Sequence, residues 1–259
     1  MSRLWARRVL VMAAALAVLA AGCSTPTAKG LPPAAPAAGP ALTYVAVGAS
    51  ETVGFGADEP FRDGWPRVLF RTALPTSAVF VNMGIPGATV ASAIRDEVPQ
   101  TLTIHPTLVT VWLNVNDIIA GVTPADFERD LGALVHSMRG NGATRVLVAN
   151  VPPLDDLPAY RACRPGAPAG SQCRGGQLPA PEVLNAVVDA YNAATDRVAS
   201  REGALVVDLH AVGLAARQAG TEASLVSSDG FHPSTAGHQA VAKAFADVLS
   251  RSGPLTPAG

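Results

Sequence analysis

Charged residues are scarce in this sequence. Asp, Glu, Lys and Arg make up 15% of the 259 residues, and the formal net charge at pH 7 is −1. Lys and Arg gather into no basic patch, so a nucleic acid is not an expected partner. Hydrophobic residues reach 49%, a composition that excludes a disordered chain and indicates a globular protein with a well-buried core.

Several common site motifs are also missing. The three cysteines form no CxxC pair, which argues against a zinc ribbon or a thioredoxin-like centre. The histidines show no HExxH or comparable metal-binding spacing, so no metal site is predicted. The absence of GxSxG argues against the nucleophile elbow of an α/β-hydrolase.

The N-terminus has the pattern of an export signal. Arg3, Arg7 and Arg8 form a positive head, and 9–22 is an uncharged run that ends in small residues. At about 14 residues this run is shorter than the ~20 that a membrane span requires. Residues 1–22 are therefore predicted to be a signal peptide, and the protein is predicted to be exported.

Cys23 follows the sequence Leu-Ala-Ala-Gly, which resembles a bacterial lipobox. By this resemblance Cys23 carries a lipid after cleavage and attaches the protein to the outer face of the cell membrane. The alternative is ordinary cleavage and secretion, with Cys23 incidental. The Pro- and Ala-rich segment 23–41 lacks the large apolar residues of a core, so it is predicted to be a tether.

From residue 42 onward, short apolar runs alternate with helical segments. Strands are expected at 42–48, 78–83, 108–113, 145–150 and 205–208. Helices are expected at 65–74, 90–100, 124–139, 183–201 and 235–249, with caps at Thr89, Thr123 and Ser234. This alternation predicts an α/β fold, a three-layer α/β/α sandwich with a mainly five-stranded parallel sheet, over residues 42–251. Residues 252–259 form a tail.

The Pro- and Gly-rich segment 151–180 interrupts this alternation and is interpreted as a long loop insertion. If Cys23 takes a lipid, Cys163 and Cys173 remain, and an exported protein oxidises such a pair. A Cys163–Cys173 disulfide across the insertion is therefore expected.

Polar clusters stand where the predicted strands end. They are Gly48-Ala49-Ser50-Glu51, Asn82-Met83-Gly84, Asn114-Val115-Asn116-Asp117 and, before the last helix, Asp229-Gly230-Phe231-His232-Pro233. Ligands of open parallel sheets bind at this edge. In this order, the clusters resemble the four motifs of the SGNH or GDSL hydrolase superfamily, and the resemblance covers essentially the whole domain.

The resemblance implies a role for each motif residue. Ser50 is the nucleophile, His232 its general base, and Asp229 the partner that orients the imidazole. The Ser50 and Gly84 backbone N–H groups and the Asn116 side-chain amide form the oxyanion hole.

The sequence departs from the family pattern at three positions. Ala49 and Glu51 replace the usual Asp and Leu beside the nucleophile, and Asn114 stands where Gly is expected. Asp117 is interpreted as a structural hydrogen-bond acceptor.

The expected activity is that of a serine esterase or acyl hydrolase that needs no metal or organic cofactor. Acyl lipids, acetylated sugars and acylated envelope components are the expected substrates. The alternatives are an SGNH acyltransferase, a carbohydrate O-deacetylase of the cell envelope, and a non-catalytic binding lipoprotein. Retention of Ser50, Asn116, Asp229 and His232 argues against the last, because binding alone does not require all four.

Overall fold

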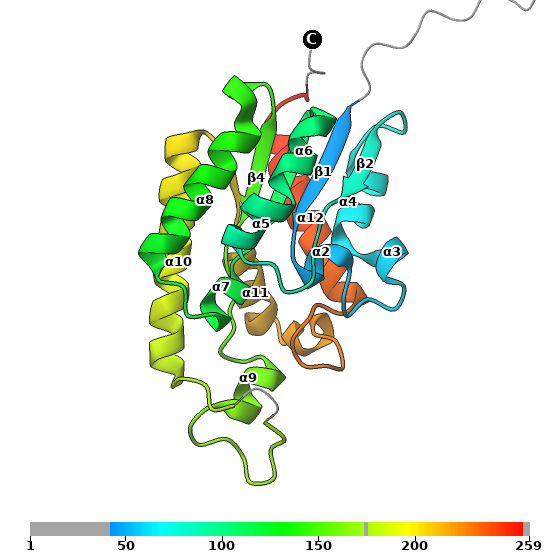
Figure 1. The fold of residues 1–259 in the computed structure, drawn as a ribbon. Helices are drawn as coiled ribbons and strands as arrows, with labels where there is room; N and C mark the ends of the chain where they lie inside the picture. Colours follow the sequence, from blue (N-terminus) through cyan, green and yellow to red (C-terminus); the bar gives the residue numbers. More distant parts are fainter. Residues whose placement is uncertain (1–41, 174–175, 256–259) are drawn as a thin grey trace, which may run out of the picture. The chain divides into compact units, whose positions relative to one another are not determined.

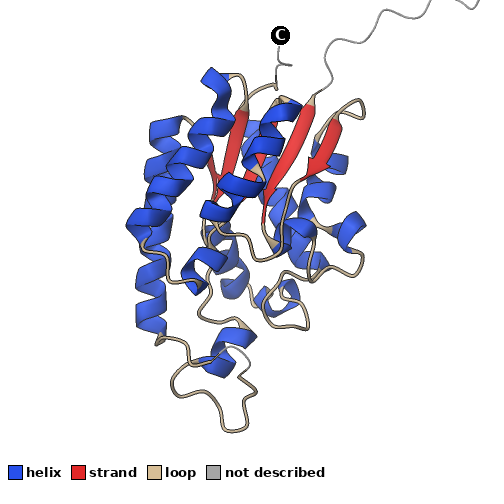
Figure 2. Ribbon diagram, viewed as in Figure 1, coloured by secondary structure: helices blue, strands red, loops and turns tan. Residues whose placement is uncertain are grey.

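The computed structural model describes residues 42–173 and 176–255, so the predicted signal peptide, Cys23 and the tether lie outside the described residues. Five parallel strands form one sheet in the order β2-β1-β3-β4-β5 (Figures 1 and 2). The strands are β1 Thr43–Gly48, β2 Val79–Asn82, β3 Leu108–Trp112, β4 Arg145–Ala149 and β5 Leu205–Val207. All five predicted strands are confirmed, with ends that differ by one residue or less, and so is the parallel α/β class.

Helices cover both faces of the sheet, as a three-layer sandwich requires (Figure 1). One face packs against α5 Val90–Asp96, α6 Val98–Ile104, α8 Pro124–Arg139 and α10 Pro181–Glu202. The other packs against α4 Trp65–Ala73, α11 Leu209–Gln218 and α12 Thr235–Arg251. Side chains alternate along β1, with Val45 and Val47 in the first core and Tyr44 and Ala46 in the second. Both sides of the strand are thereby buried.

The strand order reverses direction between β1 and β3. Chain order runs from β1 outward to β2, and β3 then returns to pair with the opposite edge of β1, in a register that places Gly48 opposite Trp112. A crevice opens at such a switch point, beyond the carboxyl ends of the two strands. The segments that follow β1 and β3 carry Ser50 and Asn116, so the topology brings these two residues to the same crevice.

Side-chain caps begin the major helices. The Thr123 hydroxyl accepts from Asp126 N at 3.1 Å before α8, and the Ser234 hydroxyl accepts from Gly237 N at 3.1 Å before α12. Thr89 and Ser92 form a reciprocal capping box at α5. These caps satisfy N–H groups that the helices leave unpaired, and all three predicted cap positions are confirmed.

The prediction of a single helix over 90–100 is wrong. The chain forms α5 and α6 instead, with Glu97 between them. Pro99 has no N–H to donate to the carbonyl four residues earlier, and its ring would clash with that carbonyl in a continuous helix. The break places Glu97 beside Gly48, at the turn that carries Ser50.

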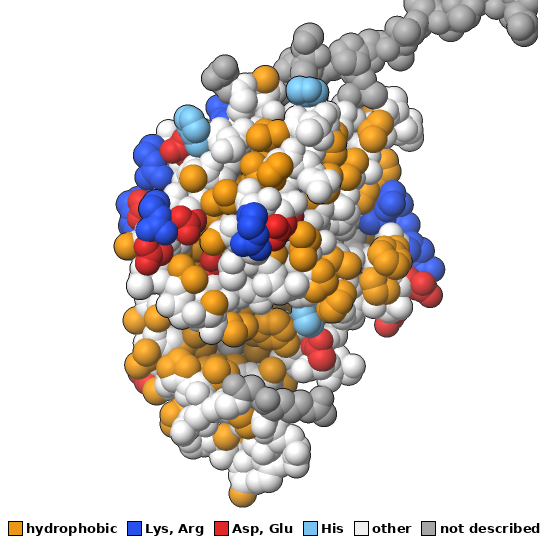
Figure 3. All heavy atoms as spheres, viewed as in Figure 1, with side chains coloured by type: hydrophobic (Ala, Val, Ile, Leu, Met, Phe, Trp, Pro, Cys, Tyr) orange, Lys and Arg blue, Asp and Glu red, His pale blue; other side chains and the backbone are white. Residues whose placement is uncertain are grey.

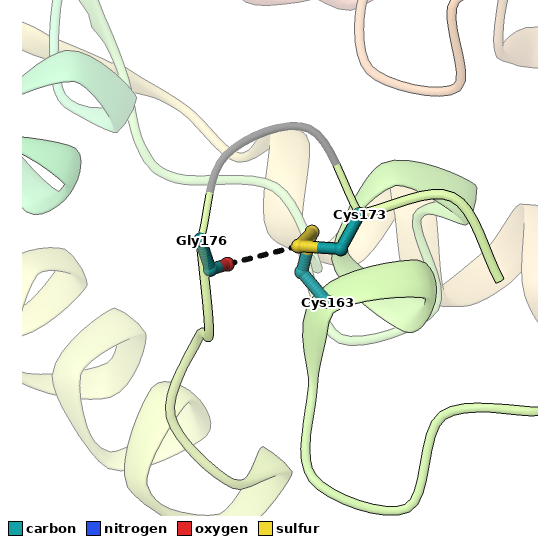
Figure 4. Close-up of a disulfide and its surroundings, with 3 residues drawn as sticks. All are labelled: Cys163, Cys173 and Gly176. Carbon is teal, nitrogen blue, oxygen red and sulfur yellow. Dashed lines mark hydrogen bonds between the residues drawn. A yellow bond between two sulfur atoms is a disulfide. The ribbon is translucent and has the colours of Figure 1, made fainter.

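The insertion 151–180 is not wholly a loop, because Pro158–Cys163 forms helix α9. Cys163 and Cys173 are joined by a disulfide with a Cα–Cα distance of 4.8 Å. Cys173 Sγ also lies 3.1 Å from the Gly176 carbonyl oxygen, a contact without a shared proton because a disulfide has no S–H (Figure 4). The expected disulfide is present and closes the insertion on itself.

The sequence also failed to predict α11 and four short helices: α2 Ser50–Val53, α3 Pro60–Asp63, α7 Val115–Ile119 and α9. Among residues 42–173 and 176–255, no helix has the length and apolar character to cross a membrane.

Candidate active site

Ser50 lies where β1 turns into α2. It is the first residue of α2, and its residue surface is 8% exposed. Gly48 allows this turn, because a Cβ at that position would lie 2.1 Å from Thr52 Oγ1 and 2.8 Å from the Trp112 carbonyl oxygen. The Gly48 N–H donates to Glu97 Oε2 at 2.9 Å, which fixes the end of the strand from below. Ser50 is therefore held on a rigid turn at the crevice.

The structure brings Ser50, His232 and Asp229 together, although Ser50 and His232 are 182 positions apart in the chain. His232 Nε2 lies 2.9 Å from Ser50 Oγ, and His232 Nδ1 lies 2.6 Å from Asp229 Oδ2. The three side chains thus form a hydrogen-bonded chain in which the imidazole lies between the hydroxyl and the carboxylate.

The partners of His232 determine its tautomer. An ionised carboxylate only accepts hydrogen bonds, so Nδ1 carries the proton that goes to Asp229, and Nε2 accepts the Ser50 hydroxyl proton. Asp229 is ionised at neutral pH: partial burial opposes ionisation, but hydrogen bonds from His232, Phe231 N and Ser227 lower its pKa to about 2. His232 is thus oriented as a base toward Ser50.

The loop around His232 is fixed from three sides. Ser227 N donates to the His232 carbonyl at 2.9 Å, and the Ser227 hydroxyl donates to Asp229 Oδ1 at 2.7 Å. The Phe231 ring lies edge-on to the imidazole with a centroid distance of 4.9 Å. Ala159 N, in α9, donates to the Gly230 carbonyl at 3.0 Å. The insertion therefore contacts the loop 227–233, which carries Asp229 and His232, directly.

Gly84 follows β2 and Asn116 follows β3, the two strands that flank β1 in the sheet. Asn116 Nδ2 donates to the Ala88 carbonyl at 3.0 Å, which leaves its second hydrogen for another acceptor. The Gly84 N–H donates to Asn82 Oδ1 at 2.9 Å. A Cβ at Gly84 would lie 3.0 Å from Thr52 Cγ2, so glycine lets this segment approach α2 closely. Gly84 can serve an oxyanion only by sharing or exchanging its bond to Asn82.

The aspartates at two other strand ends act as helix caps. Both carboxylate oxygens of Asp117 accept from Val90 N, at 3.1 and 3.2 Å, and burial raises the Asp117 pKa to about 6. Asp208 Oδ1 accepts from Ala211 N at 2.9 Å and from Asn150 Nδ2 at 2.8 Å. Each of these acids positions a helix next to the site, which agrees with the structural role expected for Asp117.

His238 is a buried structural histidine. Its Nδ1 accepts from Trp65 N at 3.2 Å, and its Nε2 donates to the Phe55 carbonyl at 2.9 Å. Burial lowers its pKa, which favours this neutral form. Within the described residues, no group of three or more His, Cys, Asp and Glu side chains is placed to hold a metal ion.

An apolar cavity of about 130 Å³ opens beside His232 and Asn116. Its walls come from the end of β3, the segment after β4, and helices α11 and α12, with Trp112, Pro153, Val212 and Val241 among them. An apolar cavity of about 150 Å³ holds a molecule the size of benzene. The cavity beside His232 and Asn116 therefore suits a small uncharged group.

Comparison with known proteins identifies the family. The profile of the GDSL-like lipase/acylhydrolase family matches residues 46–240, which is more than half of the chain. The chain belongs to this family. It is therefore an ester-cleaving hydrolase, and the family model spans all four motifs.

Solved structures of several esterases and lipases have a similar fold. The lipase/acylhydrolase from Enterococcus faecalis is 20% identical with a TM-score of 0.62, over 83% of this chain and 98% of that one. The psychrotrophic esterase EstA from Pseudoalteromonas sp. is 14% identical with a TM-score of 0.59, over 81% and 97%. A two-domain esterase active on acetylated mannans is 19% identical with a TM-score of 0.59, over 83% of this chain and 53% of that one. No protein of curated function matched the chain.

The GDSL family usually has Leu after the nucleophile, and Glu51 stands there in this chain. Glu51 Oε2 lies 3.3 Å from Ser50 Oγ, and the residue is 9% exposed. Burial raises the Glu51 pKa, which favours a neutral carboxyl. A neutral Glu51 can donate to Ser50 Oγ and leave the single serine proton directed at His232. The motif thus keeps its geometry despite a polar residue at this position.

Sequence reasoning missed two contributors to the site. Glu97 was expected inside a helix, and its contact with Gly48 depends on the break that Pro99 causes. The sequence indicates no separate role for Phe231, although its ring packs against the imidazole. An aromatic residue directly before the histidine was the one available signal.

Proposed function

We propose that the protein hydrolyses carboxylic esters through an acyl-enzyme on Ser50. The Ser50 hydroxyl attacks the ester carbonyl carbon while His232 Nε2 takes its proton. The imidazolium then protonates the departing alcohol, which leaves Ser50 acylated. Water then attacks the acyl carbon while His232 takes its proton. The imidazolium returns that proton to Ser50 Oγ as the acyl–oxygen bond breaks, which releases the carboxylic acid and restores Ser50. The contact of His232 with Ser50 at 2.9 Å and with Asp229 at 2.6 Å is the observation that carries this proposal.

Charge that develops on the carbonyl oxygen needs donors that are already in place. We assign this role to the second Asn116 Nδ2 hydrogen and the Ser50 backbone N–H, with Gly84 as a further donor. Asp229 stabilises the imidazolium and stays ionised, in line with its lowered pKa. The residues named supply the nucleophile, the base and the stabilising dipoles.

Release of p-nitrophenol from p-nitrophenyl acetate tests this function. We expect turnover by the folded protein, whereas a binding protein would show none. An alcohol added at increasing concentration separates hydrolase from acyltransferase. A hydrolase gives mainly free acid, and a transferase gives mainly the new ester.

We further propose that the protein is exported and attached to a membrane through a lipid on Cys23. The support is the apolar run that ends at the lipobox-like sequence. Cys23→Ala should move the protein to the soluble fraction or leave it uncleaved. Intact-mass measurement of an unmodified mature N-terminus in the native host would contradict the proposal.

A further inference from the structure

A second and larger apolar space lies next to the loop 227–233. It is a groove of about 810 Å³ between α7, α9 and the segment 228–231. Its apolar walls include Val115, Ile118, Ile119, Leu154, Leu157 and Phe231. Figure 3 shows hydrophobic side chains gathered in a hollow above the insertion on this face. We call this space the α7–α9 groove.

The α7–α9 groove adjoins the small cavity beside His232. The two spaces share four lining residues, Val115, Leu154, Leu157 and Phe231. Phe231 directly precedes His232, and Asp229 also lines the groove. Both spaces therefore border the segment that carries His232, whose Nε2 lies 2.9 Å from Ser50 Oγ. An ester bound there has two substituents, and each has an apolar space available.

The chemistry of the walls indicates what the groove binds. Of residues 42–173 and 176–255, no Lys or Arg lines it, and the polar side chains that do are few: Gln172, Gln177, Ser228 and Asp229. The Tyr160 hydroxyl already donates to the Pro179 carbonyl at 2.7 Å. A sugar in this groove would lose hydration at most of its hydroxyls without gaining partners, at a cost for each. A hydrocarbon chain loses nothing of this kind.

Ile119 gives the groove an unused apolar surface. It is 66% exposed at the end of α7, whereas most isoleucines of a folded protein are buried. A chain that covers Ile119 removes this surface from water, which is favourable in proportion to the area covered.

We propose that the α7–α9 groove binds a hydrocarbon chain of the substrate. The substrate is then an ester with a long chain on one side of the scissile bond and a small group, held in the 130 Å³ cavity, on the other. This inference rests on the proposed function and makes it more specific. It names a lipid-like ester as the substrate of the protein. It also gives the insertion 151–180 a role in substrate selection.

Two series of esters test the proposal. One varies the acyl group of p-nitrophenyl esters from acetyl to decanoyl, and the other varies the alcohol of acetate esters from ethyl to decyl, all below their micellar concentrations. In one series kcat/KM should rise with length, by up to about fourfold for each methylene that becomes fully buried. The series that rises shows which side of the ester enters the groove.

The variant Ile119→Glu places a carboxylate in the groove. In the series that rises, it should lower the ratio of kcat/KM for the longest ester to that for the shortest by tenfold or more. Leu102→Glu is the matched control, because Leu102 is 41% exposed in the last turn of α6 and does not line the groove. This control should keep the wild-type ratio. Since the readout is a ratio within one protein, partial loss of folded enzyme does not imitate it.

The outcomes separate the two proposals. Turnover of p-nitrophenyl acetate with no length dependence in either series would overturn the groove proposal and leave the hydrolase intact. A length dependence that Ile119→Glu leaves unchanged would place the chain elsewhere and also overturn it. Absence of turnover with every ester would instead overturn the proposed function.

Discussion

Asn116 Nδ2 donates to the Ala88 carbonyl at 3.0 Å. One amide hydrogen thus anchors the side chain to the segment before α5, and the other remains for the carbonyl oxygen of a substrate, the role that we propose for it. An anchored donor needs no reorganisation when charge develops on the carbonyl oxygen, which is the condition for a large catalytic effect.

The first prediction concerns this donor. Asn116→Ala should lower kcat by roughly 10²–10³, with a smaller change in KM, because the lost interaction forms mainly in the transition state. Steady-state kinetics on one activated ester measures both constants. Asn185→Ala, which removes an exposed asparagine bonded to Asp155 at 3.3 Å, is the control and should leave kcat near wild type. A kcat within threefold of wild type for Asn116→Ala would remove Asn116 from the oxyanion hole.

The second prediction concerns the partner of the imidazole. Asp229→Asn should lower kcat/KM by about 10² to 10⁴, the upper value being the loss for a fully buried triad aspartate. The side chain of Asp229 is 46% exposed, so water can partly replace it at the imidazolium. Ser227→Ala removes only one hydrogen bond to Asp229, at 2.7 Å, and should cause a clearly smaller loss. Equal losses in the two variants would contradict this order.

The third prediction concerns the disulfide. Cys173→Ser should lower the free energy of unfolding by no more than about 2.5–3 kcal/mol, because the closed loop is short. Its larger effect should be on the preference between long and short esters, since Cys163 lines the α7–α9 groove. Urea unfolding and the two ester series measure these effects. Labelling of both Cys163 and Cys173 as free thiols in oxidised protein would show that the bond does not form.

The fourth prediction concerns the pH dependence of stability. Glu97 is 1% exposed, and burial raises its pKa from 4.5 to about 8. A raised pKa in the folded state means that Glu97 favours folding fully below about pH 4.5 and that this contribution is lost as the pH rises through about 8. The wild-type free energy of unfolding should therefore fall between pH 5 and pH 8.

Glu97→Gln removes this titration and keeps an acceptor for Gly48 N. The variant should lose less stability than wild type between the same two pH values, as measured by urea unfolding. A remaining fall is expected because burial also raises the pKa values of Glu51 and Asp117. Glu182→Gln, an exposed change in the first turn of α10, should follow the wild-type curve. Parallel curves for Glu97→Gln and wild type would contradict the account.

Much of the scaffold could be predicted because its signals are local. Continuous apolar runs predicted the five buried strands, and Thr123 followed by Pro124 predicted the start of α8. The placement of polar clusters at strand ends predicted where a site lies. The resemblance of those clusters to the SGNH or GDSL motifs implied which residues form the triad. The presence of Cys163 and Cys173 within one insertion predicted the disulfide.

The remaining features depend on contacts that sequence patterns do not contain. Helix α9 is short and begins at a proline within a Pro- and Gly-rich segment, so its composition suggested a loop. The hydrogen bond from Gly84 N to Asn82 Oδ1 depends on the path of the chain after β2. The α7–α9 groove is built by three segments distant in sequence, and only their packing shows that the walls are apolar.

The central claim is that Ser50 carries the acyl group. The direct measurement compares turnover of p-nitrophenyl acetate and covalent labelling by a fluorophosphonate in wild type, Ser50→Ala and Ser137→Ala, where Ser137 is an exposed serine on α8. We predict that folded Ser50→Ala loses labelling and nearly all turnover, whereas Ser137→Ala keeps both. Turnover and labelling of folded Ser50→Ala at the wild-type level would contradict the account and place the nucleophile elsewhere.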